Sequence, residues 1–251
     1  MNLRRFDGLC AMITGAANGI GAAVAHRLAA EGAAIAVIDL EEERLRAEFA
    51  SLPDAACLTM AGDCTDQAML QGFLAAAEAK LGPVGVLVNN VGQSARERGS
   101  PFVTSREEVW RFVLEVSLMT GLRLTRLVTP GMQARGFGRI VNMSSDAALA
   151  GDAGLVDYAT AKMGLVGFTR SLARELAPDG ITVNAVAPGA VRTRAHERIP
   201  AQVLERIRRG TPAGFIAEPE DVAGLVAYLA SPEARFVTGQ TILIDGGRWM
   251  L

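Results

Sequence analysis

Short apolar runs alternate with longer amphipathic segments from one end of the chain to the other. The runs are rich in Val, Ile, Leu and Ala and are bounded by Gly, Pro, Asn or Asp, which is typical of strands buried on both faces of a parallel sheet. We expect seven strands, over residues 9–14, 34–39, 57–60, 84–89, 137–145, 181–187 and 240–244.

The segments between the runs predict helices that end near residues 31, 51, 81, 133, 177 and 230. The fourth helix, from about residue 104, is long, and we expect a break near Pro130. Strands and helices alternate without a linker or repeat, so we predict an α/β fold: residues 1–251 as a single-domain, doubly wound parallel sheet with helices on both faces. The arginine-rich stretch within residues 190–215 lacks a core pattern and predicts a lid over the site.

A glycine-rich turn, TGAANGIG, lies between the first strand and the first helix. Gly15 allows the tight turn, Gly19 lets the backbone approach a pyrophosphate, and Gly21 allows the helix to pack closely against the strand. Asp39 ends the second strand, where a carboxylate can accept hydrogen bonds from an adenosine ribose. Glutamates at 41–43 and the lack of an adjacent arginine favour NAD over NADP. Asp39 could instead simply cap the next helix, which would leave the glycine spacing unexplained.

Polar residues also follow the third and fourth strands. Asp63 lies at the carboxyl end of the third strand, where ligands bind in open α/β sheets. Asn89, Asn90 and Gly92 follow the fourth strand. They suit a tight turn facing a cofactor, and they suit an ordinary turn equally well.

A tyrosine and a lysine lie one turn apart on the helix predicted after the fifth strand. Tyr158 and Lys162 are four residues apart, so they would project side by side. A nearby ammonium lowers the pKa of a phenol, and such a tyrosine can exchange a proton with an alcohol or a carbonyl oxygen. Ser145, at the end of the fifth strand, can hold the same oxygen by a hydrogen bond. Such pairs also arise by chance, but this chain has only two Tyr and two Lys.

Composition narrows the functional class. The net charge of −2 gives no reason to expect a nucleic-acid partner, and no apolar run is long enough to span a membrane. Cys10, Cys57 and Cys64 lack metal or disulfide spacing, which fits a reducing cytoplasm. The two histidines, His26 and His196, are far apart, so we expect neither a metal site nor a Ser-His-Asp triad.

The motifs TGAANGIG, NNVG, YATAK and PGAVRT, together with Ser145, resemble those of the short-chain dehydrogenase/reductase family from about residue 7 to residue 247. That family uses NAD or NADP and moves a hydride between the nicotinamide and a carbonyl or alcohol carbon. The resemblance implies that Tyr158 is the acid/base, that Lys162 lowers its pKa and holds the nicotinamide ribose, and that Ser145 holds the substrate oxygen. It also implies a homotetramer that pairs the long helix and the Tyr-Lys helix across an interface.

The same resemblance supplies the residues expected to line the cofactor. They are Gly15, Asn18, Gly19, Ile20, Gly21, Asp39, Asp63, Cys64, Asn89, Val91, Gly92, Tyr158, Lys162, Pro188, Gly189, Val191 and Thr193.

One position departs from the family pattern. The family usually has an asparagine 28 residues before the catalytic serine, where it helps seat a water that links the lysine to solvent; here that position is Ser117. Serine is shorter and has no amide carbonyl, which puts the proton relay in doubt but not the hydride chemistry. We expect a water to fill the gap and Ser117 to belong to the catalytic set.

We therefore expect a cytoplasmic, NAD-dependent enzyme that acts on the CH–OH group of a small secondary alcohol or on the corresponding ketone. A dinucleotide-binding regulator without turnover is one alternative, supported only by Ser117. A 3-oxoacyl-thioester reductase is another, because arginines in the two loops that should flank the substrate suit an anionic group: Arg96, Arg98, Arg192, Arg194 and Arg198. The same arginines also suit a solvated surface, and Asp179 disfavours an acyl-carrier substrate.

Overall fold

The computed structural model describes residues 4–98, 100–194 and 201–250. Its centre is a seven-stranded sheet in the order β3-β2-β1-β4-β5-β6-β7, and every neighbouring pair is parallel. The strands are β1 Cys10–Thr14, β2 Ala34–Asp39, β3 Cys57–Ala61, β4 Val84–Asn89, β5 Gly138–Met143, β6 Ile181–Pro188 and β7 Thr241–Ile244. All seven predicted strands are confirmed; the fifth was predicted three residues too long, and the bounds of the others agree to within one residue.

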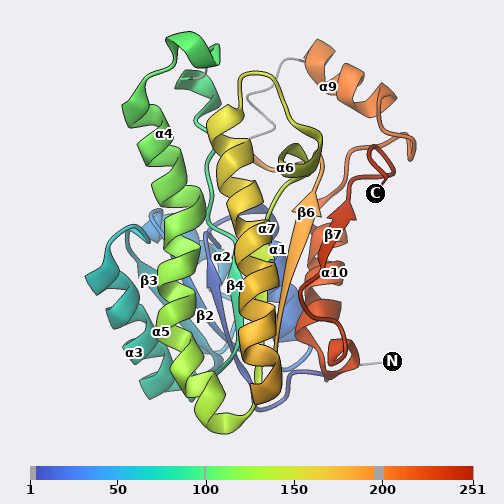
Figure 1. Ribbon diagram of the computed structural model, residues 1–251. Coiled ribbons are helices and arrows are strands. Elements are labelled where there is room, and N and C mark those ends of the chain that lie inside the picture. Colours follow the sequence, from blue (N-terminus) through green and yellow to red (C-terminus); the bar gives the residue numbers. More distant parts are fainter. Residues whose placement is uncertain (1–3, 99, 195–200, 251) are drawn as a thin grey trace.

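Helices cover both faces of this sheet, as predicted (Figure 1). They are α1 Gly19–Ala30, α2 Glu42–Glu48, α3 Gln67–Leu81, α4 Glu107–Leu114, α5 Thr120–Arg135, α6 Asp146–Ala150, α7 Val156–Leu176, α9 Ala201–Arg209 and α10 Pro219–Ala230. Side chains of β1 alternate between two cores: Ala11 and Ile13 join the residues of α1 and α10, whereas Cys10 and Met12 join those of α3, α5 and α7.

The structure differs from the prediction of one long helix over residues 104–133 with a break near Pro130. Pro130 lies inside α5 without ending it, because Val128 and Met132 on either side are buried against the sheet. The irregularity lies earlier, in a π-helical turn, Glu115–Met119, that separates α4 from α5. Single π turns of this kind are often found at functional sites.

Two further helices were not predicted. The short helix α6 follows Ser145 directly, and α9 lies inside the stretch for which we predicted a lid. Residues 195–200 of that stretch, which include His196 and Arg198, lie outside the described residues. Among the described residues, no helix is both long enough and apolar enough to cross a membrane.

Candidate active site

The three residues expected to act on a substrate oxygen come from the end of β5 and from α7. Ser145 caps α6, where its Oγ accepts a hydrogen bond from the Ala147 N–H at 3.2 Å. Tyr158 and Lys162 lie one turn apart on α7, and Lys162 Nζ lies 5.7 Å from the centroid of the Tyr158 ring. The Ser144 hydroxyl donates to the Lys162 carbonyl oxygen at 2.9 Å, which fastens the end of β5 to α7.

Lys162 is almost completely enclosed by the protein. Its side chain is 2% exposed, and Nζ donates to the Met143 carbonyl oxygen at 2.8 Å. None of the described carboxylates forms a salt bridge with it. Burial lowers the pKa of Lys162 to about 8. The positive charge of Lys162 therefore lies close to the Tyr158 ring without a carboxylate to neutralise it among the described residues.

The turn after β4 makes room for this lysine. A Cβ atom at Gly92 would lie 2.6 Å from Lys162 Nζ, so a residue with a side chain there would collide with the ammonium. In the same turn, the Asn90 amide donates to the carbonyl oxygens of Thr14 and Gly15 at 3.0 and 2.9 Å. The turn therefore joins the lysine to the glycine-rich turn after β1.

Ser117 lies in the π-helical turn and is buried. Its Oγ accepts from the Gln93 N–H at 2.9 Å and donates to the Gln93 carbonyl oxygen at 3.1 Å. The hydroxyl is therefore committed to the backbone of the loop after β4, and it lies 3.5 Å from the point where a Gly92 Cβ would be. Ser117 thus borders the lysine pocket, and both of its hydrogen bonds hold the loop after β4.

The glycine-rich turn has the backbone shape that a pyrophosphate cradle needs. Gly15 and Gly19 have φ of +67° and +57°, a region that residues with a Cβ rarely adopt. Asp39 ties this turn to β2: its Oδ2 accepts from the Ala17 N–H at 2.9 Å and its Oδ1 accepts from the Glu41 N–H at 3.2 Å. Each carboxylate oxygen retains acceptor capacity for a further donor.

A cavity of about 500 Å³ opens beside Asp39. Four predicted cofactor residues line it, namely Asp39, Asp63, Cys64 and Val91, together with side chains of α4 and of the π-helical turn. Burial raises the pKa of the Cys64 thiol to about 12, so this cysteine lines the cavity as a neutral thiol and does not act as a nucleophile. The size and the acidic edge of the cavity fit a nucleoside.

Comparisons with known proteins agree with this geometry. A family model described as Enoyl-(Acyl carrier protein) reductase matches residues 15–248. The chain is 41% identical to the Short-chain reductase protein NovJ of Streptomyces niveus over 95% of this chain and 93% of that one. The chain belongs to the short-chain dehydrogenase/reductase (SDR) family. The 3-oxoacyl-[acyl-carrier-protein] reductase FabG of Vibrio cholerae is 37% identical over 100% of both chains.

The solved structures extend the match from sequence to shape. The crystal structure of Levodione Reductase has a TM-score of 0.91 and 31% identity, covering 97% of this chain and 98% of that one. This SDR is therefore an oxidoreductase of a family that uses a nicotinamide cofactor, as the sequence predicted.

The remaining residues predicted to line the cofactor lie in several elements, where they also make structural contacts. The Asn89 amide is buried and donates to Thr125 and Asn142, so it joins the strand ends to α5. Ile20 and Gly21 anchor α1, Pro188 ends β6, and Val191 pairs with Ala217. Gly189 and Thr193 approach other loops closely: a Cβ on Gly189 would lie 2.9 Å from the Asp245 Cβ, and one on Gly19 would lie 3.0 Å from the Thr193 Cγ2.

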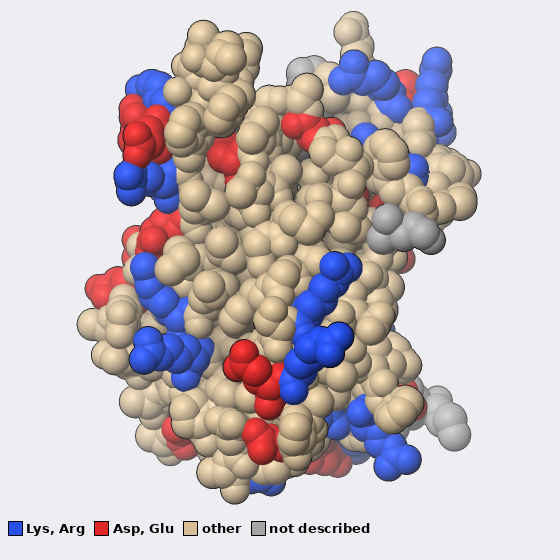
Figure 2. Space-filling model, viewed as in Figure 1, with Lys and Arg blue, Asp and Glu red and all other residues tan. Residues whose placement is uncertain are grey.

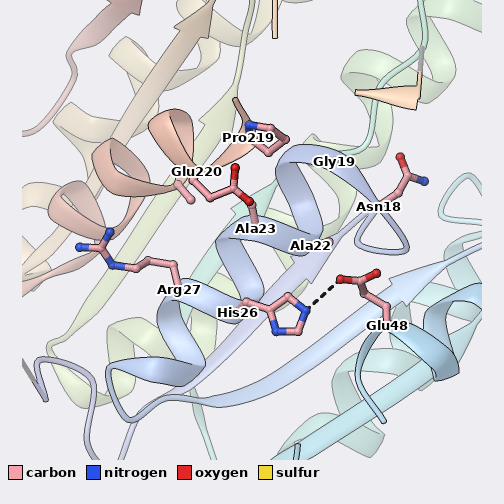
Figure 3. Close-up of a pocket in the computed structure, with 10 residues that line it drawn as sticks. Asn18, Gly19, Ala22, Ala23, His26, Arg27, Glu48, Pro219 and Glu220 are labelled. Carbon is pink, nitrogen blue, oxygen red and sulfur yellow. Dashed lines mark hydrogen bonds and ion pairs between the residues drawn. The ribbon is translucent and has the colours of Figure 1, made fainter. Parts of the chain in front are cut away.

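Asn18 borders a second hollow on the outer side of α1. This hollow has a volume of about 440 Å³ and is lined by residues of α1, α2 and α10. Figure 3 shows the hydrogen bond between His26 and Glu48 on one wall, and its length is 2.9 Å. Apart from Asn18 and Gly19, none of its lining residues belongs to the predicted cofactor set: Ala22, Ala23, His26, Arg27, Glu48, Pro219, Glu220 and Ala223.

Two ion pairs at the site were not foreseen. Arg194, after β6, forms a two-pronged ion pair with Glu41, after β2. Asp146, which accepts from the Ser145 hydroxyl at 3.3 Å, also pairs with Arg248 at 3.3 Å. Burial raises the pKa of Asp146, and the nearby Arg248 opposes that shift. Each pair joins distant parts of the chain, so no local sequence signal could have revealed either one.

Proposed function

We propose that this SDR is a cytoplasmic, NAD-dependent dehydrogenase that interconverts a small secondary alcohol and its ketone. The observation that carries the proposal is the arrangement of Tyr158 beside a buried Lys162 that has no carboxylate partner among the described residues. A cation in such a place favours the phenolate over the phenol, which is what a tyrosine acid/base requires.

In the reducing direction, the roles follow from the chemistry of these side chains. Tyr158 gives its hydroxyl proton to the substrate oxygen, and the Lys162 ammonium stabilises the phenolate that remains. Ser145 donates a hydrogen bond to the same oxygen. To do so, its hydroxyl rotates away from Asp146, to which it donates in the structure. The nicotinamide supplies the hydride when it is bound. Ser117 supports the loop next to the lysine, and we expect a water to complete the proton path.

The dinucleotide would be held along the carboxyl edge of the sheet. Gly15 and Gly19 would cradle the pyrophosphate at the start of α1, and Asp39 would accept from the adenosine ribose. Three acidic residues follow Asp39 within four positions, Glu41, Glu42 and Glu43, which supports NAD over NADP. The other residues of the predicted cofactor set keep their assignment as part of this proposal.

The arginines of the two loops that were expected to flank the substrate support an uncharged substrate. Arg98 lies over the Phe112 ring at 4.4 Å, Arg192 pairs with Glu218 at 3.1 Å, and Arg194 pairs with Glu41. Each of these three cations already has a partner, so none needs an anionic group of the substrate. The second candidate is a 3-oxoacyl thioester, favoured by the identity to FabG.

The outer face of α7 supports the proposal of a homotetramer. Val156 and Met163 are 48% and 40% exposed, and Leu118 covers Gly164 closely enough to lie 3.0 Å from a Cβ placed there. Figure 2 shows mostly uncharged surface between α4 and α7 in this view. A second copy packed there would bury apolar side chains that a monomer leaves in water. We also propose that residues 1–251 act as one domain, with residues 190–215 as the substrate lid.

Fluorescence titration with NADH and NADPH, followed by turnover on matched substrates, tests the proposal. The substrates are secondary alcohols, simple ketones and a 3-oxoacyl thioester, all followed at the nicotinamide absorbance. We expect NADH to bind more tightly and simple ketones to turn over. Preferential turnover of the thioester would select the second candidate, and NADH binding without turnover of any substrate would point to a regulator.

A further inference from the structure

A basic residue from a distant segment of the chain, Arg194, lies at the adenosine end of the proposed cofactor site. Arg194 Nη1 donates to Glu41 Oε2 at 2.8 Å, and Nη2 donates to Glu41 Oε1. Both prongs of the guanidinium are thus used on one carboxylate. The two side chains are 35% and 38% exposed, so the pair lies at the rim of the site, where it can open.

This ion pair lies next to the carboxylate expected to hold the ribose. The Glu41 N–H donates to Asp39 Oδ1 at 3.2 Å, so the residue that holds Arg194 is itself hydrogen-bonded to Asp39. Thr193, which precedes Arg194, lies against the glycine-rich turn, because a Cβ on Gly19 would be 3.0 Å from Thr193 Cγ2. Residues 193 and 194 therefore link the start of α1 to Glu41, the residue after the end of β2 that Asp39 holds.

We propose that Glu41 sets the choice between NAD and NADP by holding Arg194, a side chain otherwise placed to bind a ribose 2′-phosphate. The inference rests on the proposed function, in which a nicotinamide dinucleotide binds with its adenosine at Asp39. A guanidinium binds phosphate and carboxylate through the same pair of parallel N–H bonds. A 2′-phosphate would have to displace Glu41 from Arg194, and it would then lie close to the carboxylates of Asp39 and Glu41.

The surrounding charges define the controls. Arg44 also contacts Glu41, with Nε 3.2 Å from Oε2, so it is a second cation that a change at Glu41 would release. Glu42 pairs with Arg46 on the outside of α2. Glu43 belongs to the same acidic run, and no salt bridge joins it to Arg194. Glu43→Gln therefore removes the same charge as Glu41→Gln while leaving the Arg194 pair intact.

The test is a binding titration that needs no substrate. Dissociation constants of NADH and NADPH are measured by nucleotide fluorescence for the wild type and for Glu41→Gln, Arg194→Met, the double variant and Glu43→Gln. The readout is the ratio of the two constants in each protein. We expect the wild type to favour NADH, and Glu41→Gln to shift the ratio toward NADPH by about tenfold, because a repulsive charge is lost and an attractive one is released.

The other variants decide whether Arg194 is the reason. We expect the double variant to lose most of the shift, and Glu43→Gln to shift the ratio by less than about threefold, since an exposed charge is screened. Retention of the full shift in the double variant would overturn the inference in favour of Arg44 or of net charge, and so would an equal shift in Glu43→Gln. A wild type that favours NADPH would also overturn it. If the wild type binds neither nucleotide, the proposed function fails first.

Discussion

Replacing Lys162 by methionine should stabilise the nucleotide-free protein at neutral pH while abolishing its chemistry. The lysine is fully enclosed and its pKa is lowered from 10.5 to about 8, with burial as the cause. Methionine is similar in length, keeps the aliphatic packing and carries no charge that must be desolvated. The substitution therefore separates the cost of the buried ammonium from its function.

The size and pH dependence of the gain follow from the two pKa values. Between pH 8 and pH 10.5 the unfolded state binds more protons than the folded state, so the penalty is complete below pH 8 and shrinks as the pH rises. It amounts to about 3 kcal/mol at pH 7 and about 1 kcal/mol at pH 10. Loss of the hydrogen bond to the Met143 carbonyl oxygen offsets about 1 kcal/mol. The expected net gain is about 2 kcal/mol at pH 7 and close to zero at pH 10.

Urea unfolding without nucleotide at the two pH values measures this difference. The only other lysine, Lys80, is the matched control: it pairs with the exposed Asp54 at 2.9 Å, and Lys80→Met should lower stability by at most about 1 kcal/mol. A Lys162→Met protein less stable than the wild type at pH 7 would refute the reasoning. So would a gain of equal size at pH 7 and pH 10, because it would come from packing rather than from charge.

Three further substitutions test the surroundings of the site. Ser117→Asn should leave kcat within about threefold of wild type, the effect of one ordinary hydrogen bond; a many-fold rise in steady-state turnover would show that the serine limits the proton relay. Gly21→Ala should lower the free energy of unfolding by about 2 kcal/mol, because the added methyl would lie 2.2 Å from a backbone oxygen. In the same denaturation assay Gly72→Ala, with no atom within 4 Å, should not destabilise. Arg248→Met should cost about 1 kcal/mol at pH 8 and less at pH 5, because the pair is lost as Asp146 takes up a proton; an equal cost at both pH values would contradict this pairing.

Much of the fold could be predicted because buried parallel strands leave a strong signal. The runs 34–39 and 84–89 match β2 and β4 residue for residue. The π-helical turn could not be found this way, since its i to i+5 bonding depends on how Thr120 and Glu115 pack. At Pro130 we predicted a break that the structure does not have. The packing of α5 against the sheet outweighed the loss of one helical hydrogen bond. The helix α6 has only five residues, too few for a periodic pattern.

For the site, local spacing was informative and distant contacts were not. The interval of four between Tyr158 and Lys162 predicts their proximity, which the structure confirms. That Lys162 contacts a carbonyl oxygen rather than a carboxylate depends on the end of β5. The preference for NAD assumed that no arginine is adjacent to the acidic run after Asp39; in the structure Arg44 contacts Glu41, and so does Arg194, which is 153 residues away from Glu41 in the sequence.

The central claim is that Tyr158 transfers the proton to the substrate oxygen. The most direct measurement is ketone-dependent oxidation of NADH by Tyr158→Phe, with Tyr228→Phe as the control, since Tyr228 is the only other tyrosine and lies at 38% exposure on α10. The account predicts that Tyr158→Phe binds NADH as the wild type does but shows no turnover, while Tyr228→Phe stays active. Turnover by Tyr158→Phe at a rate near that of the wild type would contradict it.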